Sequence, residues 1–181
     1  MSVSYTISEL TDTNKEGYMK KIFLFFLLFA LCLSLFACAE AKEYRNDYNC
    51  AKLLGDASEQ LPIELGYKSL GGEHIKYNFD ATELDDDHAF LASVSSSDIN
   101  EFGVFHAPTE DARQRLLELT EKYLDNSLEE KEAFIASYAP EELEKLKNAE
   151  ARCFGNYVTY AILSKDDKEL FFDTVEKLLA K

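Results

Sequence analysis

The densest cluster of chemically competent side chains lies near the middle of the chain, where three aspartates precede a histidine. Asp85, Asp86 and Asp87 offer carboxylate oxygens that suit a hard cation, and His88 adds an imidazole nitrogen that suits a transition metal. The spacing does not match an EF-hand loop, which needs a glycine and a distal glutamate. These four residues are therefore either a metal site or a solvated acidic turn, which is the commoner outcome of such a pattern.

The other two histidines have less context. His106 is expected on a strand, on the same side as Phe102 and Val104, where it is either a buried base or a hydrogen-bonded structural residue. His74 follows a pair of glycines, and no partner for it can be identified. No serine lies in a G-x-S-x-G or S-x-x-K pattern, and no glycine-rich phosphate loop is present. The sequence thus identifies no catalytic residue and no cofactor site.

The elements that must position these side chains begin with a helix. Residues 48–60 carry apolar side chains at helical spacing, and Pro62 ends that helix. Residues 66–78 contain two adjacent glycines and are predicted to form a loop with a short helical turn. Residues 89–94 are expected to form a strand with Phe90, Ala92 and Val94 on one side, and residues 102–107 follow after a polar stretch, which predicts two strands of a hairpin.

A long helical pattern follows from Thr109. Its apolar stripe extends to Phe134 and Tyr138, and Pro140 ends it before a short further helix. Ser127 has capping-box spacing to a glutamate, so it either starts a new helix or lies inside a continuous one.

The strongest local signal in the second half of the chain is residues 151–163, two β-rich runs joined by Gly155 and Asn156, which suit a tight hairpin turn. Ser164 is a good N-cap for a final helix. The order is helix, then strand-strand-helix twice. It predicts an α+β two-layer sandwich, with a four-stranded, mainly antiparallel sheet and helices packed on one face.

Near the N-terminus, residues 19–39 have the layout of a bacterial export signal, in which Lys20 and Lys21 precede an uncharged run. The end of this run resembles a lipobox, whose cysteine, here Cys38, receives a diacylglycerol; Phe36 departs from that pattern. Cleavage by the ordinary signal peptidase, giving a secreted protein, and retention of the segment as an uncut anchor are the alternatives.

These features divide the chain into four parts. Residues 1–18 are interpreted as a mis-assigned start or an extended beginning of the signal, residues 19–39 as the signal, residues 40–47 as a polar tether and residues 48–181 as one α+β domain. The formal net charge of −15 excludes nucleic acid as an expected partner and disfavours anionic lipid headgroups. Membrane attachment is therefore expected through the lipid on Cys38.

Two cysteines, Cys50 and Cys153, fall in the predicted domain. An extracytoplasmic location would let them form a disulfide, worth nominally ~4 to 5 kcal/mol for a loop of about a hundred residues. Two buried thiols are the alternative that we favour, because a domain of this size needs no covalent staple. Their spacing matches neither a zinc site nor a thioredoxin-like motif.

The sequences around FGVFHA (residues 102–107), YAPEELEKLKNAE (residues 138–150) and GNYVTYAIL (residues 155–163) resemble a bacterial lipoprotein family called "domain of unknown function 4358". The resemblance spans about residues 48–179. It implies a small exported, often lipid-anchored α+β domain with no assigned activity, and it brings no catalytic residues.

The expected function is a non-enzymatic binding module held at the cell envelope outside the cytoplasm. Its partner would be an envelope protein or peptide, which could add a strand to an open sheet edge along residues 102–107 or 157–163. The alternative is an envelope enzyme or metal-binding protein that uses Asp85 to His88 and His106.

Overall fold

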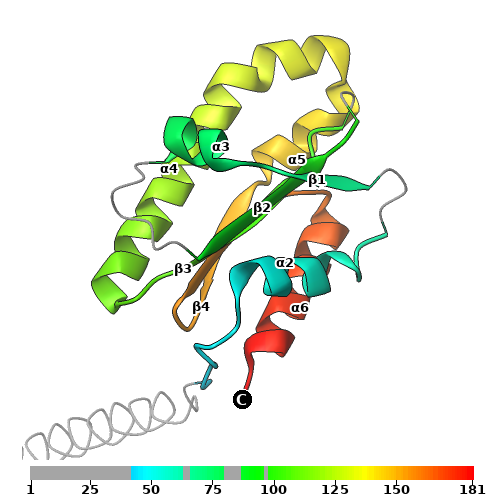
Figure 1. Cartoon of the computed structure of the whole chain (residues 1–181). Helices are drawn as coiled ribbons and strands as arrows, with labels where there is room; N and C mark the ends of the chain where they lie inside the picture. The colour runs from blue at the N-terminus through cyan, green and yellow to red at the C-terminus, as the bar shows by residue number, and fades with distance from the viewer. Residues whose placement is uncertain (1–41, 63–65, 80–86, 96–97) are drawn as a thin grey trace, which may run out of the picture. The chain divides into compact units, whose positions relative to one another are not determined.

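The computed structural model describes residues 42–62, 66–79, 87–95 and 98–181. The predicted export signal, Cys38, Asp85 and Asp86 lie outside these residues. Helices and strands alternate along the described chain (Figure 1). In chain order the elements are α2 (Cys50–Ser58), β1 (Tyr67–Ser69), α3 (Gly72–Asn78), β2 (His88–Ser93), β3 (Glu101–His106), α4 (Glu110–Tyr138), η2 (Pro140–Glu142), α5 (Leu143–Lys147), β4 (Glu150–Phe154), β5 (Tyr157–Ile162) and α6 (Lys165–Leu179).

The strands form one antiparallel sheet in the order β1-β2-β3-β5-β4. Both predicted hairpins are present, and Gly155 has the positive φ of 58° that the turn between β4 and β5 requires. The α+β class is thus confirmed, but the sheet has a fifth strand, β1, in a segment predicted as a loop. The predicted open edges are wrong, because β3 and β5 are interior strands and the edges are β1 and β4.

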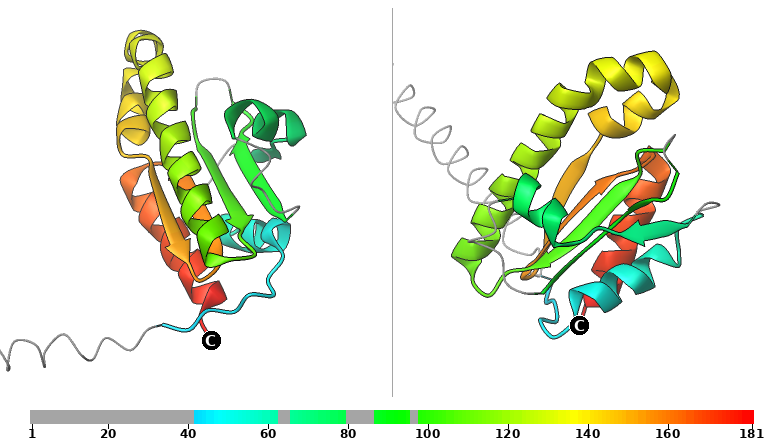
Figure 2. Two further views of the ribbon diagram at one scale, coloured as in Figure 1. Left: turned by 90° about the vertical axis from the view of Figure 1, so that its left-hand side faces the viewer. Right: turned by 45° about the horizontal axis from the view of Figure 1, so that its top comes forward.

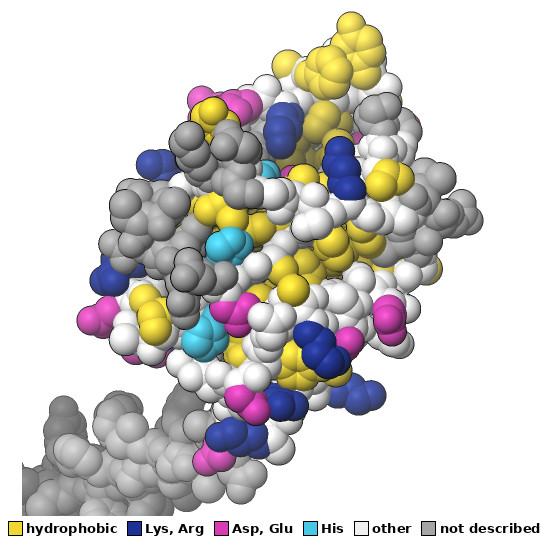
Figure 3. Space-filling model, viewed as in Figure 1, with side chains coloured by type: hydrophobic (Ala, Val, Ile, Leu, Met, Phe, Trp, Pro, Cys, Tyr) yellow, Lys and Arg dark blue, Asp and Glu magenta, His cyan; other side chains and the backbone are white. Residues whose placement is uncertain are grey.

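Helix α4 begins after Thr109, as predicted, and the Thr109 hydroxyl caps it by accepting the backbone N–H of Ala112; the helix continues through Ser127 without a break. Its 29 residues span about 43 Å, whereas a six-residue strand spans about 20 Å. The second half of α4 therefore outruns the sheet. Phe134 and Tyr138, predicted on the apolar stripe, are 65% and 77% exposed, and their tilted rings pack with centroids 4.6 Å apart. Hydrophobic side chains are accordingly visible at this end of the molecule (Figure 3).

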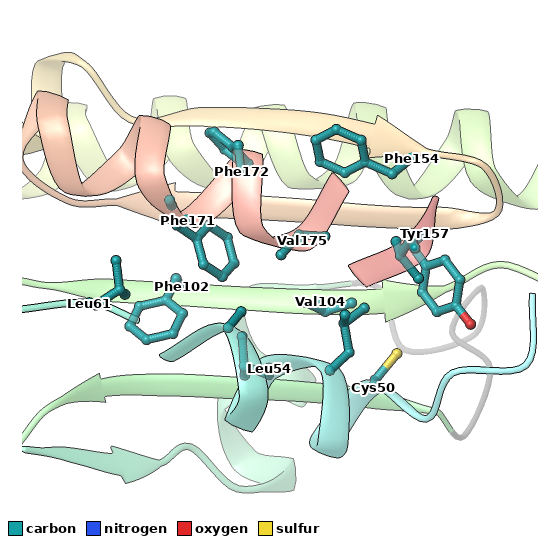
Figure 4. Close-up of a cluster of buried hydrophobic side chains, with 14 of the residues drawn as sticks. Cys50, Leu54, Leu61, Phe102, Val104, Phe154, Tyr157, Phe171, Phe172 and Val175 are labelled. Atoms are coloured by element: carbon teal, nitrogen blue, oxygen red, sulfur yellow. The ribbon is translucent and has the colours of Figure 1, made fainter. Parts of the chain in front are cut away.

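Helices cover both faces of the sheet, which corrects the predicted two-layer arrangement (Figure 2). On one face, α2 and α6 pack on alternate residues of β3 and β5; we call this the α2/α6 core (Figure 4). Phe102 packs against Phe171 there, with ring centroids 5.1 Å apart. The residues that α2 and α6 contribute to this core include Leu53, Leu54, Ala57, Phe171, Phe172 and Val175, all at most 1% exposed.

The opposite face, which we call the α4 core, is covered by α3, α4 and α5. Its centre is aromatic, because Phe79 and Phe90 stack at 5.8 Å and Phe105 meets both rings edge-on. Gly103 lies beneath these rings. A Cβ at this position would come within 2.5 Å of the rings of Phe90 and Tyr160, so only glycine lets them close over β3.

The N-terminal segment of the described chain docks on the domain before α2 begins. The backbone of Tyr44 pairs with Ala180 in an antiparallel bridge, and the Arg45 N–H donates to the Leu179 carbonyl at 2.8 Å. Further along, the Tyr157 hydroxyl bonds both backbone groups of Tyr48, at 2.9 and 2.7 Å. The compact unit therefore begins at Glu43, five residues before the predicted boundary, and most of the predicted tether belongs to the fold.

Candidate functional site

Asp87, one of the two described residues of the predicted metal cluster, caps a helix. Asp87 Oδ1 accepts hydrogen bonds from the backbone N–H of Cys50 and from the side-chain amide of Asn49, both at 2.9 Å. A carboxylate at a helix N-terminus satisfies otherwise unpaired backbone donors of α2. Within the described ranges, no three His, Cys, Asp or Glu side chains come together in a way that could hold a metal ion.

The predicted histidine sites have separate structural surroundings. His106 ends β3, where Nε2 lies 2.7 Å from Asn46 Oδ1 and the ring packs 5.1 Å from that of Tyr157. His88 begins β2 on the other face, with its ring 5.7 Å from Phe90. His106 thus helps to fasten the N-terminal segment to the sheet.

Cys50 and Cys153 are both thiols, so the structure contains no disulfide between them. Cys50 lies in the α2/α6 core, where its thiol donates to the Asp87 carbonyl at 3.3 Å, whereas Cys153 packs against the α4 core. The sheet separates the two side chains. Burial raises the pKa of the Cys153 thiol, which keeps it protonated.

A polar cluster that the sequence did not reveal lies at the start of β3. Glu101 Oε1 accepts hydrogen bonds from the hydroxyls of Tyr123 at 2.6 Å and Tyr160 at 2.7 Å. Burial, reinforced by the charge of Glu101, raises the pKa of both tyrosines, so both remain hydrogen-bond donors. One carboxylate thereby ties β3, β5 and α4 together inside the α4 core.

His74 joins this cluster from α3. Its Nε2 lies 3.5 Å from Glu101 Oε1, too far for a well-formed hydrogen bond, and this nitrogen is buried without a hydrogen-bond partner. The imidazole ring packs 5.7 Å from Tyr123 and 5.3 Å from Phe90. Burial lowers the pKa of His74, with Lys131 acting in the same direction and Glu101 opposing it.

Glu101 also lines a pocket of about 390 Å³, which we call the α4 pocket. Its floor is one row of residues across four strands, since Lys68 pairs with Ala92, Ala92 with Glu101, and Glu101 with Ile162. Because Ala92 has only a methyl group, the floor is low between Lys68 and Glu101. The volume of the α4 pocket falls within the ~300 to 1,000 Å³ typical of small-molecule sites.

The wall of the α4 pocket comes from the part of α4 that extends past the sheet. Lys131, Phe134 and Ile135 line it there, and Leu146 of α5 closes one end. In Figure 3, dark-blue Lys or Arg side chains lie beside hydrophobic ones just below the tip of the molecule. The pocket therefore combines apolar surface with charged side chains at its margin.

The residues just before β3, Asp98 to Asn100, complete the pocket and are held in place by a salt-bridge network. Lys145 Nζ lies 2.8 Å from Glu142 and 3.2 Å from Asp98, and Glu142 accepts the backbone N–H of Ile99 at 3.1 Å. Burial alone would raise the pKa of Asp98, but hydrogen bonds from the Asn100 N–H and from Lys145 outweigh it and lower that pKa. Asp98 thus faces the pocket as an ion that is already paired.

The lysines of the pocket are not paired in this way. Lys68 and Lys131 are both exposed, and neither makes a hydrogen bond or a salt bridge in the part of the chain that the structure describes. The acids have partners: Asp98 has Lys145, and Glu101 has two phenols. Glu101 keeps its negative charge, because its phenol partners are neutral, and the two exposed lysines are the pocket cations that lack an ion-pair partner among the described residues.

No family model, no curated protein and no solved structure matches this chain significantly. The family resemblance drawn from the sequence therefore stays a prediction. Of the helices in the described ranges, none combines the length and apolar character that crossing a membrane requires.

Proposed function

We propose that this protein is an exported, membrane-tethered binding module that takes a ligand in the α4 pocket and acts without catalysing a reaction. The tethering rests on the export signal over residues 19–39 and on Cys38 as the lipid-bearing residue. The observation that carries the binding role is the pocket itself, a hollow between the sheet and α4 with apolar walls and charged side chains at its margin.

The pocket and the tether occupy opposite ends of the domain. Strand β3 begins with Glu101 in the pocket and ends with His106, which contacts Asn46 of the docked N-terminal segment. Its five residue steps span about 17 Å. A lipid on Cys38 would lie within about 18 Å of Glu43, even with the intervening chain fully extended. The docked end of the domain, rather than the pocket, is therefore the end that the chain connects to the proposed lipid.

Two mass measurements on full-length protein purified from the membrane fraction test this proposal. The intact mass should correspond to a chain that begins at Cys38 and carries a diacylglycerol. Native mass spectrometry should detect a bound small molecule that is lost in Ala92→Leu, because leucine fills the low part of the pocket floor. Ala51→Leu is the matched control, since Ala51 is exposed on α2, on the other face of the sheet.

Each half of the proposal can fail by itself. An uncut chain in the soluble cytosolic fraction would contradict export and tethering. A bound molecule that survives Ala92→Leu would contradict the assignment of the pocket as the ligand site. Equal loss of the molecule in Ala92→Leu and Ala51→Leu would contradict it too, because the effect would not be specific to the pocket.

A further inference from the structure

The positive charges of the α4 pocket are notable because the chain as a whole is strongly acidic. With 34 acidic and 19 basic residues, acids are plentiful enough to pair with lysines. Lys52, Lys145 and Lys168 do so, with Asp56, Glu142 and Glu150. Lys68 on β1 and Lys131 on α4 instead line one pocket from two sides, and neither has a salt-bridge partner among the described residues.

The acids in the same pocket do not supply those missing partners. Asp98 Oδ1 is held by Lys145 at 3.2 Å and by the backbone N–H of Asn100 at 2.9 Å. Glu101 Oε1 accepts both buried tyrosine hydroxyls. Moving either carboxylate toward Lys68 or Lys131 would leave buried donors without an acceptor, which costs ~1 to 3 kcal/mol for each group.

The surface between the two lysines is apolar. Phe134 is 65% exposed, and Leu70 and Ala92 are partly exposed, so their side chains still have area to bury against a ligand. A ligand that covers this apolar surface also removes water from the neighbouring ammonium groups. That desolvation is costly unless the ligand brings an anion to pair with them. A lysine is a point charge that accepts a carboxylate or a phosphate equally well.

Resting on the proposed binding function, we infer that the α4 pocket takes a small amphiphilic anion. Its single anionic head, a carboxylate or phosphate, lies between Lys68 and Lys131, and its apolar part lies on Ala92, Leu70 and Phe134. A volume of about 390 Å³ restricts the occupant to a small molecule or to the end residue of a longer chain. The free acid and the terminus of a peptide share this chemistry.

Lysine footprinting on the full-length protein tests the inference with octanoate as the probe. Limited acylation followed by peptide mass spectrometry gives the labelling rate of each lysine separately. At several times its Kd, octanoate should slow the labelling of both Lys68 and Lys131 by about fivefold or more. Lys122 on the same helix and Lys165 on α6 are exposed internal controls, and their rates should not change.

Matched probes separate charge from hydrophobicity. Octanol has the same chain without the anion and octylammonium reverses the charge, so neither should protect the lysines at the same concentration. A peptide ending in leucine, compared with its C-terminal amide, tells a chain terminus from a free acid: protection by the carboxylate form alone would show that the pocket accepts termini. Lys68→Gln and Lys131→Gln, both at exposed positions, should each weaken protection of the remaining lysine.

The outcomes distinguish this inference from the function on which it rests. If octanol or octylammonium protects as well as octanoate, and Ala92→Leu abolishes that protection, the pocket remains a ligand site but its anion preference is overturned. If Ala92→Leu leaves octanoate protection intact, the anion binds elsewhere and the inference fails. If no probe protects either lysine and native mass spectrometry finds no bound molecule, the inference and the proposed function fail together.

Discussion

The two faces of the sheet are covered to different extents. On the α2/α6 face, which we call the sealed face, two helices cover the central strands, and the core residues of both helices and of β3 between them are almost fully buried. On the α4 face, the long helix crosses the sheet and continues beyond it, α3 covers only part of the remainder, and a pocket stays open next to a buried carboxylate. Both faces thus contribute a buried core, and the α4 face also has room for a ligand.

Each face holds a buried polar atom without a hydrogen-bond partner among the described residues, the Tyr67 hydroxyl on the α2/α6 face and His74 Nε2 on the α4 face, but their best-connected polar groups differ. The Tyr157 hydroxyl in the sealed face bonds both backbone groups of Tyr48, so it has a donor and an acceptor. In the α4 face, one oxygen of Glu101 accepts from both Tyr123 and Tyr160, while the Nε2 nitrogen of His74 lies nearby without a hydrogen-bond partner. Incompletely satisfied buried groups are destabilising, and they concentrate where a structure does something besides fold.

The largest effect is expected from opening the sealed face. Phe171→Ala removes a fully buried ring that contacts Phe102 and Phe172, and it should lower the free energy of unfolding by about 3 to 5 kcal/mol. Urea denaturation followed by circular dichroism measures this. Leu170→Ala, the neighbouring and 40% exposed position, is the control and should cost about 0.5 kcal/mol or less. Similar costs at the two positions would contradict the sealed core.

Overpacking the α4 face should have the next largest effect. In Gly103→Ala the new Cβ collides with the rings of Phe90 and Tyr160, which are too tightly packed to move freely, so we expect a loss of about 3 kcal/mol. Gly55→Ala is the matched control. Gly55 lies inside α2 with nothing within 4 Å of the added carbon, so alanine should stabilise the helix by about 0.5 to 1 kcal/mol. A Gly103→Ala protein as stable as wild type would show that the aromatic layer is loose.

The elements that local sequence could predict are those whose signals are local. The Gly155 turn, the helix start at Thr109, the Ser164 cap and the hairpin of β2 and β3 each depend on a few neighbouring residues, and each is found in the structure. Strand β1 was missed because its three residues become a strand only by pairing with β2, as Tyr67 does with Ser93.

The two-sided coverage and the pocket have different causes. Strand β5 is buried at all six positions, and its run of apolar side chains without strict alternation was a signal for helices on both faces. The α4 pocket had no such signal. It arises because Lys68, Ala92 and Glu101 fall in one cross-strand row, which is a property of register, and because α4 is longer than the sheet, which left Phe134 exposed.

Removing the carboxylate beside the pocket should have a smaller effect than overpacking. Glu101→Ala leaves the hydroxyls of Tyr123 and Tyr160 without their acceptor, and we expect a loss of about 2 kcal/mol. Glu101→Gln keeps an acceptor oxygen in place and should lose about half as much. Urea denaturation of both variants measures the difference, and an equal loss would indicate that packing, rather than the hydrogen bonds, accounts for the role of Glu101.

The smallest effect is a dependence of stability on pH that only the α4 face should show. Because burial lowers the pKa of His74 below its ordinary value of 6.5, the unfolded chain binds a proton more readily than the folded domain does. The stability that neutral His74 provides is fully present above pH 6.5. It is lost as the pH falls from there to the lower pKa of the folded state.

The charged and titratable groups facing His74 are Glu101 from β3, and Tyr123 and Lys131 from α4, and both tyrosines of the cluster stay protonated in this pH range. The difference in unfolding free energy between wild type and His74→Gln, measured in steps from pH 8 to 5, isolates His74, because the other carboxylates and histidines titrate in both proteins. The unfolding free energy of wild type relative to that of His74→Gln should fall steadily below pH 6.5. A difference that does not change with pH would mean that His74 can take up a proton in the folded domain, with Glu101 compensating fully for its burial. The polar cluster would then be as well satisfied as the Tyr157 hydroxyl on the sealed face.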